Sequence, residues 1–196
     1  QPETGAELAD DLERIATNFG AENIAACIVE PISGSTGTLV PPKGYLNRLR
    51  QICDKHNILL IFDEVITGWG RTGSSFASKE YGVTPDLITM AKATTNGIVP
   101  MGVVAVKEEI YDTIVNSSPD GVIELFHGYT YSGIPVAVAA ALAVQDIFEK
   151  EDIFNRAKNL SSYFLDGLFS LKDIDCIENI RGYGLMGGID IKKSDR

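Results

Sequence analysis

The fold is decided by the stretch ILLIFDEV, which covers residues 58–65. Its first five residues are too uniformly apolar for a half-exposed strand, so we expect a central parallel strand that is covered on both faces. Asp63 follows them at the carboxyl end of the expected strand, which is where open α/β sheets place their ligands. Burying a carboxylate is costly unless a cation meets it. Asp63 is therefore a candidate site residue, although a helix cap or a structural ion pair explains its position equally well.

Patterns typical of helices and of strands alternate along the rest of the chain. Apolar residues recur at helical spacing in several segments, and short apolar runs mark further strands. We expect strands over residues 24–29, 87–91 and 102–106, and helices over residues 8–19, 44–56, 108–115, 135–148 and 153–171. Such alternation indicates an α/β fold with a mostly parallel sheet. The helix over residues 135–148 is apolar nearly all round, so we expect it to be buried.

Composition and charge exclude several classes of protein. Of the 196 residues, 44% are hydrophobic and 22% are charged, so apolar burial can offset the entropy of ordering and disorder is not expected. A net charge of −10 argues against nucleic acid and anionic membranes as partners, because both attract Lys and Arg. No stretch approaches the roughly 20 continuous apolar residues of a membrane-spanning helix. The chain has only two histidines, so no metal site is expected.

The start of the chain and its cysteines bear on its processing and location. The opening residues QPET contain neither a basic nor an apolar segment, so no signal peptide is expected. The missing initiator Met indicates a cut piece or a processed product. The three cysteines lie far apart, and an odd number argues against a disulfide framework. Reduced, buried thiols in a cytoplasmic protein are expected. Charge density rises at residues 149–152, where we expect a boundary between domains at 1–150 and 151–196.

Two further segments carry side chains suited to chemistry. Lys92 follows the apolar run at 87–91 and precedes small, polar residues that leave room for a planar ligand. A lysine there is unusual because lysine is rarely buried unpaired, although a surface loop is the simpler explanation. Residues 127–133, HGYTYSG, supply hydroxyl and N–H groups just before a helix, which suits an anion. An ordinary helix-capping loop explains that segment equally well.

Two glycine-rich segments invite a nucleotide-binding interpretation that we discount. Residues 182–187, GYGLMG, fit the letters of a dinucleotide fingerprint, but a strand-like segment follows at 188–191 where the fingerprint requires a helix. Residues 68–75 resemble a phosphate-binding loop, but Ser74 stands where a lysine must reach the phosphates. A nucleotide-binding doubly wound domain is therefore the last-ranked alternative.

Several ordered motifs together resemble one family of enzymes. The motifs are VEPISG at 29–34, FDEVITGWGRTG at 62–73, TPDL at 84–87 and MAK at 90–92. They are similar to those of class III aminotransferases, which are pyridoxal-phosphate (PLP) enzymes of fold type I. The stretch over residues 95–132 looks most like the ω-amino acid–pyruvate (β-alanine–pyruvate) aminotransferases. The resemblance implies part of a three-layer, mostly parallel PLP-binding large domain, followed by the start of a small α+β C-terminal domain.

The resemblance also implies a role for each candidate residue. Lys92 is the expected catalytic residue, because a PLP enzyme needs an amine that forms a Schiff base with the cofactor aldehyde. Asp63 keeps the pyridine nitrogen protonated, and Val65 packs on the face of the ring. Ile66 stands where some relatives have Gln, so it offers no hydrogen bond to the ring hydroxyl. Glu30 matches a carboxylate near the site, with a plain structural ion pair as the alternative.

A homodimer with shared active sites is a further implication of the resemblance. Thr130 matches the residue that reaches the phosphate of the neighbouring subunit's cofactor. Ile134 departs from the pattern, because relatives usually have His there. The family's upstream phosphate-binding segment, its ring-stacking aromatic residue and most of its small domain are expected to lie outside these 196 residues.

The expected reaction is transamination, in which an ω-amino acid or primary amine gives its amino group to PLP and pyruvate or a similar keto acid accepts it. One alternative is another class III PLP reaction, such as that of an aminomutase or a decarboxylating transaminase. Alanine formed from β-alanine and pyruvate would separate these reactions. The other alternative is an incomplete chain that acts only as an inactive folding or assembly unit, which PLP binding to the 196-residue chain would contradict.

Overall fold

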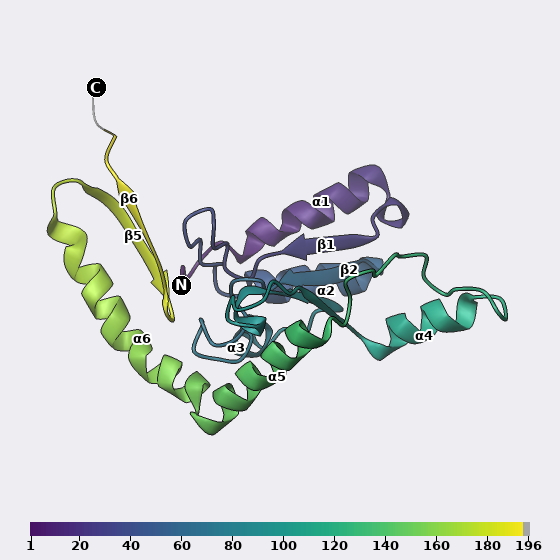
Figure 1. The fold of residues 1–196 in the computed structure, drawn as a ribbon. Coiled ribbons are helices and arrows are strands. Elements are labelled where there is room, and N and C mark those ends of the chain that lie inside the picture. Colours follow the sequence, from purple (N-terminus) through teal and green to yellow (C-terminus); the bar gives the residue numbers. More distant parts are fainter. Residues whose placement is uncertain (194–196) are drawn as a thin grey trace.

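A four-stranded sheet forms the centre of the computed structural model, which describes residues 1–193 (Figure 1). Its strands lie in the order β1 (Ala26–Val29), β2 (Leu59–Asp63), β3 (Leu87–Met90) and β4 (Val103–Val106). The pairs β1–β2 and β2–β3 are parallel, whereas β4 runs antiparallel to β3. The expected α/β fold with a mixed, mostly parallel sheet is therefore confirmed.

The hydrophobic core lies between one face of this sheet and two helices, α1 (Asp10–Phe19) and α2 (Tyr45–His56). The buried stripe of α2 consists of Leu46, Leu49, Ile52 and Cys53. This stripe belongs to the same cluster as Leu60 and Phe62 of β2, both of which are 0% exposed. Helix α2 ends at Asn57, which adopts a left-handed conformation that turns the chain into β2.

The opposite face of the sheet is exposed, which corrects the expectation that β2 is covered on both faces. Successive side chains of a strand point to opposite faces, so Leu60 is buried while its neighbour Leu59 is 37% exposed. On β1 and β4, Ile28 and Val104 are each 61% exposed. Strand β2 is thus covered on one face and not on both, and no helix among residues 1–193 covers these side chains. An apolar run shows that both faces of a strand are suited to burial. It does not show that the same chain contains helices that pack on both faces.

An elbow of two helices, α5 (Pro135–Lys150) and α6 (Ile153–Phe169), follows the sheet (Figure 1). Helix α5 has its proline in the first turn, as expected. It is buried along one stripe only, since Ala141 is buried while Val136 and Leu142 are 61% and 60% exposed. The expectation of a fully buried helix is wrong for this chain, because a helix that is apolar all round needs packing partners on every side.

The chain ends in a separate two-stranded hairpin of β5 (Ile177–Tyr183) and β6 (Met186–Ile191). Gly184 makes its turn with φ 59°, and a Cβ there would lie 2.4 Å from the carbonyl oxygen of Arg71. The N–H of Leu185 donates to that same oxygen at 2.8 Å. The hairpin tip is therefore seated on the glycine-rich loop. Strand β6 follows the glycines where a dinucleotide fingerprint needs a helix, which supports discounting that motif.

The remaining elements are short. They are α3 (Ala77–Tyr81), α4 (Glu108–Ser117) and the 3-10 turns η1 (Ala6–Ala9), η2 (Ala21–Asn23), η3 (Lys92–Thr94) and η4 (Ser170–Asp173). In the part of the chain that the structure describes, no helix has the length and apolar character needed to cross a bilayer. All three cysteines are free thiols, with Cys53 buried, Cys27 half-buried and Cys176 exposed.

Candidate functional site

Asp63 ends strand β2 with its carboxylate held in a fixed direction. Its Oδ1 atom accepts hydrogen bonds from the backbone N–H of Val65 (3.0 Å) and from the hydroxyl of Thr89 on strand β3 (3.2 Å). Within residues 1–193, its Oδ2 atom has no hydrogen-bond donor. Asp63 is half-buried at the carboxyl edge of the sheet. This second oxygen is therefore available to a ligand at that edge.

Lys92 lies at the same edge of the sheet, one strand away. Strand β3 ends at Met90, and Lys92 begins the turn η3 that follows. Thr89 lies opposite Asp63 in the parallel register, on strands that are about 5 Å apart, and three residues span at most roughly 10 Å. The Lys92 side chain is exposed, and its amine makes no ion pair or hydrogen bond within the described residues. An uncommitted amine and a carboxylate thus share one edge of the sheet.

Glu64, which sequence reasoning missed, is a fully buried carboxylate that holds the loop after Asp63. It accepts hydrogen bonds from the N–H groups of Ala77 (2.6 Å) and Ser78 (2.8 Å) and from the hydroxyl of Thr67 (3.1 Å). The first two donors belong to the first turn of α3, where backbone N–H groups lack partners within the helix. A second carboxylate directly after a strand end is the one sequence signal that could have indicated this capping role.

The other expected cofactor residues flank Asp63. Val65 and Ile66 are half-buried at the start of the loop. Ile66 contacts the neighbouring turn so closely that a Cβ on Gly34 would lie 2.6 Å from its Cδ1 atom. Glu30 closes that turn, because its carboxylate accepts a hydrogen bond from the N–H of Gly34 (2.9 Å). Glu30 makes no ion pair within residues 1–193. Its structural role is therefore to stabilise a turn, and not to form the ion pair considered as the alternative.

A hydrogen bond that no local pattern indicates connects the glycine-rich loop with the Lys92 turn. The indole N–H of Trp69 donates to the hydroxyl of Thr94 at 3.1 Å. Sequence reasoning assigned no role to either residue, although Trp69 lies in the motif at 62–73, because the two are distant along the chain. Their contact places a rigid aromatic side chain directly behind the turn that carries the amine.

Asp86 braces the strands at their other end. It is 6% exposed and accepts hydrogen bonds or ion pairs from Arg50, Lys107 and the N–H of Leu60, each at 2.7 Å. Burial raises the pKa of Asp86, but the bonds from Lys107, Leu60 and Arg50 outweigh it and hold the pKa below its ordinary value. This cluster joins α2, β2, β3 and the end of β4. These bonds fix the strands relative to one another, and so they also fix the positions of the strand ends that carry Asp63 and Lys92.

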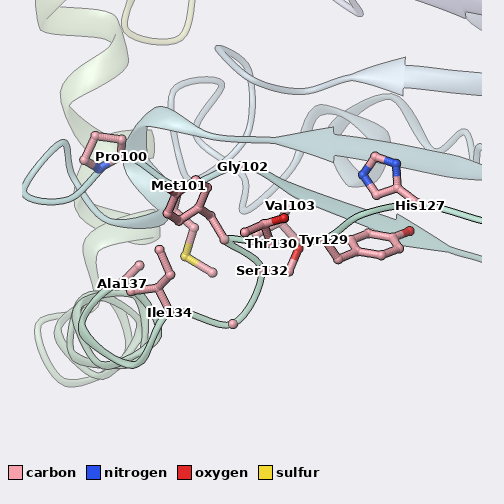
Figure 2. A pocket seen from close by; sticks show the side chains of 12 residues that line it. Pro100, Met101, Gly102, Val103, His127, Tyr129, Thr130, Ser132, Ile134 and Ala137 are labelled. Atoms are coloured by element: carbon pink, nitrogen blue, oxygen red, sulfur yellow. The ribbon is translucent and has the colours of Figure 1, made fainter.

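Thr130 lies apart from these residues, on the loop between α4 and α5. That loop and the segment before β4 line a hollow of about 820 Å³. Figure 2 shows Met101 from the segment before β4 and Tyr129, Thr130 and Ser132 from the loop among the residues that line it. Neither Asp63 nor Lys92 lines this hollow. Within one chain the structure thus does not bring Thr130 together with the other candidates.

The groups at the carboxyl edge fit PLP. The free Oδ2 of Asp63 can accept a hydrogen bond from a protonated pyridine nitrogen, and the exposed amine of Lys92 can bond to an aldehyde. Val65 offers an apolar side chain beside the carboxylate. Nothing in residues 1–193 neutralises the carboxylate, so a cationic ring nitrogen would meet an unsatisfied partner.

Known proteins match the chain along almost all of its length. The family model for class-III aminotransferases matches residues 2–196. The chain is 57% identical over 192 residues to an omega-aminotransferase of Caulobacter vibrioides, a match that covers 98% of this chain and 44% of that protein. It is 51% identical over 192 residues to a beta-alanine–pyruvate aminotransferase of Pseudomonas aeruginosa, covering 97% and 43% respectively.

A solved structure supports the same grouping. An amine transaminase from an uncultivated Pseudomonas species, crystallised in a PLP-bound form, is 41% identical and superposes with a TM-score of 0.88. The match covers 96% of this chain and 43% of that one. The chain therefore spans less than half the length of these relatives.

Proposed function

This chain belongs to the class-III aminotransferase family, and from that premise we propose that it serves PLP-dependent transamination. The donor is an ω-amino acid or a primary amine, and the acceptor is pyruvate or a similar keto acid. The names of two relatives, an omega-aminotransferase and a beta-alanine–pyruvate aminotransferase, support this choice of substrates. The observation that carries the proposal is that Asp63 and Lys92 both follow neighbouring parallel strands to the same carboxyl edge of the sheet.

Each residue at that edge has a task toward the cofactor. When bound, PLP supplies an electron sink for the electron pair of the substrate's breaking C–H bond. Asp63 holds a proton on the pyridine nitrogen through its Oδ2 atom. Lys92 would hold the cofactor covalently through Nζ, and its amine would carry a proton as a general base and acid. Val65 covers the ring, whereas Ile66 has no group that could bond to a ring hydroxyl.

We assign Glu30 a place near the site as a residue that shapes the turn next to Ile66. Its carboxylate is half-buried and already accepts the N–H of Gly34. That bond engages Oε2 and leaves Oε1 for a further donor. We therefore assign Glu30 to the wall of the pocket and not to proton transfer.

We place the active site at the interface of a homodimer. Thr130 lines its own hollow and is separate from Asp63 and Lys92 within one chain, which is the arrangement expected if it serves the phosphate of a partner's cofactor. The loop around it also exposes large apolar side chains, including Phe126 at 87% and Tyr131 at 81%. Such a cluster is typical of a surface that another subunit covers.

The domain boundary near residue 150 and the three-layer architecture remain part of this proposal. Strands β5 and β6 form a sheet of their own after the α5–α6 elbow, which supports a large-domain part at 1–150 and the start of a small domain at 151–196. The exposed apolar face of the main sheet offers a surface for a second helical layer. Three free thiols support a reducing location such as the cytoplasm.

Replacing Lys92 in the full-length enzyme tests the proposed function. We expect the wild type to develop a visible absorption band with PLP and to form alanine from β-alanine and pyruvate. Lys92→Ala should lower the turnover number at least about a thousandfold, because the covalent attachment and the proton carrier are both lost. Lys79→Ala, which removes an exposed lysine without an ion pair, is the matched control and should leave turnover unchanged.

Two outcomes would contradict the proposal. A Lys92→Ala enzyme that still transfers amino groups at the wild-type rate would remove Lys92 from its role. A wild type that consumes β-alanine with PLP but forms no alanine from pyruvate would indicate another reaction of the same family.

A further inference from the structure

A chain of hydrogen bonds joins the glycine-rich loop to the turn that carries Lys92. The indole N–H of Trp69 donates to the hydroxyl oxygen of Thr94 at 3.1 Å. That hydroxyl donates in turn to the backbone carbonyl of Ala91 at 3.0 Å, and the same carbonyl accepts the N–H of Thr94 at 2.9 Å. Thr94 is 3% exposed, so water does not compete for these bonds.

The chemistry of the members fixes the direction of this chain. An indole nitrogen can only donate and a carbonyl oxygen can only accept, so the Thr94 hydroxyl must accept from one side and donate to the other. Bonds arranged in this way polarise one another, and each strengthens its neighbour. Removing the indole N–H would therefore weaken the hold on the Ala91 carbonyl, although Trp69 is not bonded to it directly.

The backbone at Lys92 needs such a hold. Its φ of 44° lies in the left-handed region, which residues with long side chains seldom adopt outside functional sites. A conformation of this kind persists only where several neighbouring contacts determine it. The Ala91 carbonyl belongs to the peptide plane that enters Lys92. On the other side, the Lys92 carbonyl accepts the N–H of Gly97 at 3.2 Å.

Trp69 is itself held firmly enough to act as a fixed point. Its backbone N–H donates to the carbonyl of Ser75 at 2.6 Å, and its own φ is 64°. Its ring lies 5.0 Å from that of Phe76 and is stacked at 5.8 Å on that of Phe148 from α5. The indole is therefore clamped between the loop and a helix, and its N–H has one direction available.

We propose that Trp69 is a positioning residue for Lys92. Through Thr94 it fixes the peptide plane between Ala91 and Lys92, and so directs the Lys92 amine toward the edge where Asp63 lies. The inference rests on the proposed function, because the direction of the amine matters only if Lys92 captures a cofactor. It goes beyond that function by assigning a task to a side chain that touches neither cofactor nor substrate.

The test uses the full-length enzyme, freed of PLP and then given PLP again. Trp69→Phe keeps an aromatic ring for stacking and removes only the N–H donor. We expect it to slow the growth of the visible cofactor band roughly three- to tenfold, the effect of about one hydrogen bond. It should lower kcat by a similar factor while KM for β-alanine stays within about twofold of wild type.

Variants of Thr94 show whether the two residues act in series. Thr94→Val should slow PLP capture as much as Trp69→Phe does, and Thr94→Ser, which keeps a hydroxyl, should restore most of the rate. The double variant Trp69→Phe/Thr94→Val should be no slower than Thr94→Val alone, because the chain is already broken. If Thr94→Val does not fold, Trp69→Phe and Thr94→Ser carry the comparison.

Phe148→Leu separates positioning from packing. It removes one of the two rings that hold the indole but keeps the indole N–H and the contact with Phe76, so we expect a lower melting temperature and less slowing of PLP capture than in Trp69→Phe. Equal slowing in Phe148→Leu and Trp69→Phe would overturn the inference, and so would wild-type capture by Trp69→Phe or independent effects in the double variant. A wild type that forms no cofactor band would instead contradict the proposed function itself, which keeps the two failures distinct.

Discussion

The segment from Asp63 to Thr95 and the loop at residues 118–134 are both expected at the active site, yet they are built in opposite ways. In the first segment, Glu64 finds its partners inside the chain and accepts three hydrogen bonds while fully buried. In the second, the side chains of residues 119–134 are exposed, Phe126 among them at 87%. The difference teaches that this chain determines the geometry around Lys92 by itself. The geometry around Thr130 depends on whatever covers the loop.

The largest effect on stability is expected from a substitution at Glu64, in the first segment. Glu64→Ala leaves the N–H groups of Ala77 and Ser78 buried without acceptors and opens a cavity, which should cost about 3 kcal/mol of unfolding free energy. Urea denaturation of the full-length enzyme measures the loss. Glu64→Gln, which keeps one acceptor oxygen, is the control and should lose less. An unchanged midpoint in Glu64→Ala would show that the segment does not depend on this carboxylate.

A smaller effect on stability is expected when the pH is lowered, because Asp86 then becomes protonated. Its pKa is lower in the folded protein than its ordinary value of about 3.9, so its contribution to stability is complete above that value and is lost as the pH falls toward the lower folded pKa. We expect a loss of about 1–2 kcal/mol below roughly pH 4 from the bonds to Lys107 and Arg50. Urea midpoints between pH 3 and 6 measure it. Asp86→Asn should start less stable and show a flatter pH dependence, and equal slopes would contradict the assignment.

The smallest effect on stability is expected in the second region. Phe126→Ser should change the unfolding free energy of the folded chain by less than about 0.5 kcal/mol, because the side chain is already in water. In the full-length enzyme the same change should lower the fraction of dimer, which sedimentation velocity measures. Tyr163→Ser, at an equally exposed site on α6, is the control. A large loss of stability with no change in assembly would show that the loop is packed within its own chain.

The sequence predicted well what depends on local pattern. The apolar run before Asp63 forms the expected strand, which ends at Asp63, and the next strand brings Lys92 to the same edge of the sheet. What it could not predict depends on pairing between distant segments. The bond from Trp69 to Thr94 arises only when loop and turn are folded together. Burial was overestimated for β2 and α5 because hydrophobicity reports what a surface can bury, and not which segment arrives to cover it.

The seat of the hairpin tip on the glycine-rich loop has a consequence for anyone recombining relatives into chimaeras. The turn at Gly184 leaves no room for a side chain against the backbone of Arg71, and the N–H of Leu185 donates a hydrogen bond to the Arg71 carbonyl. A crossover placed between these two segments would combine the hairpin turn of one parent with the glycine-rich loop of another, and the two would not fit together. Library designs should therefore inherit residues 68–75 and 183–185 from one parent as a block, even though more than a hundred positions separate them along the gene.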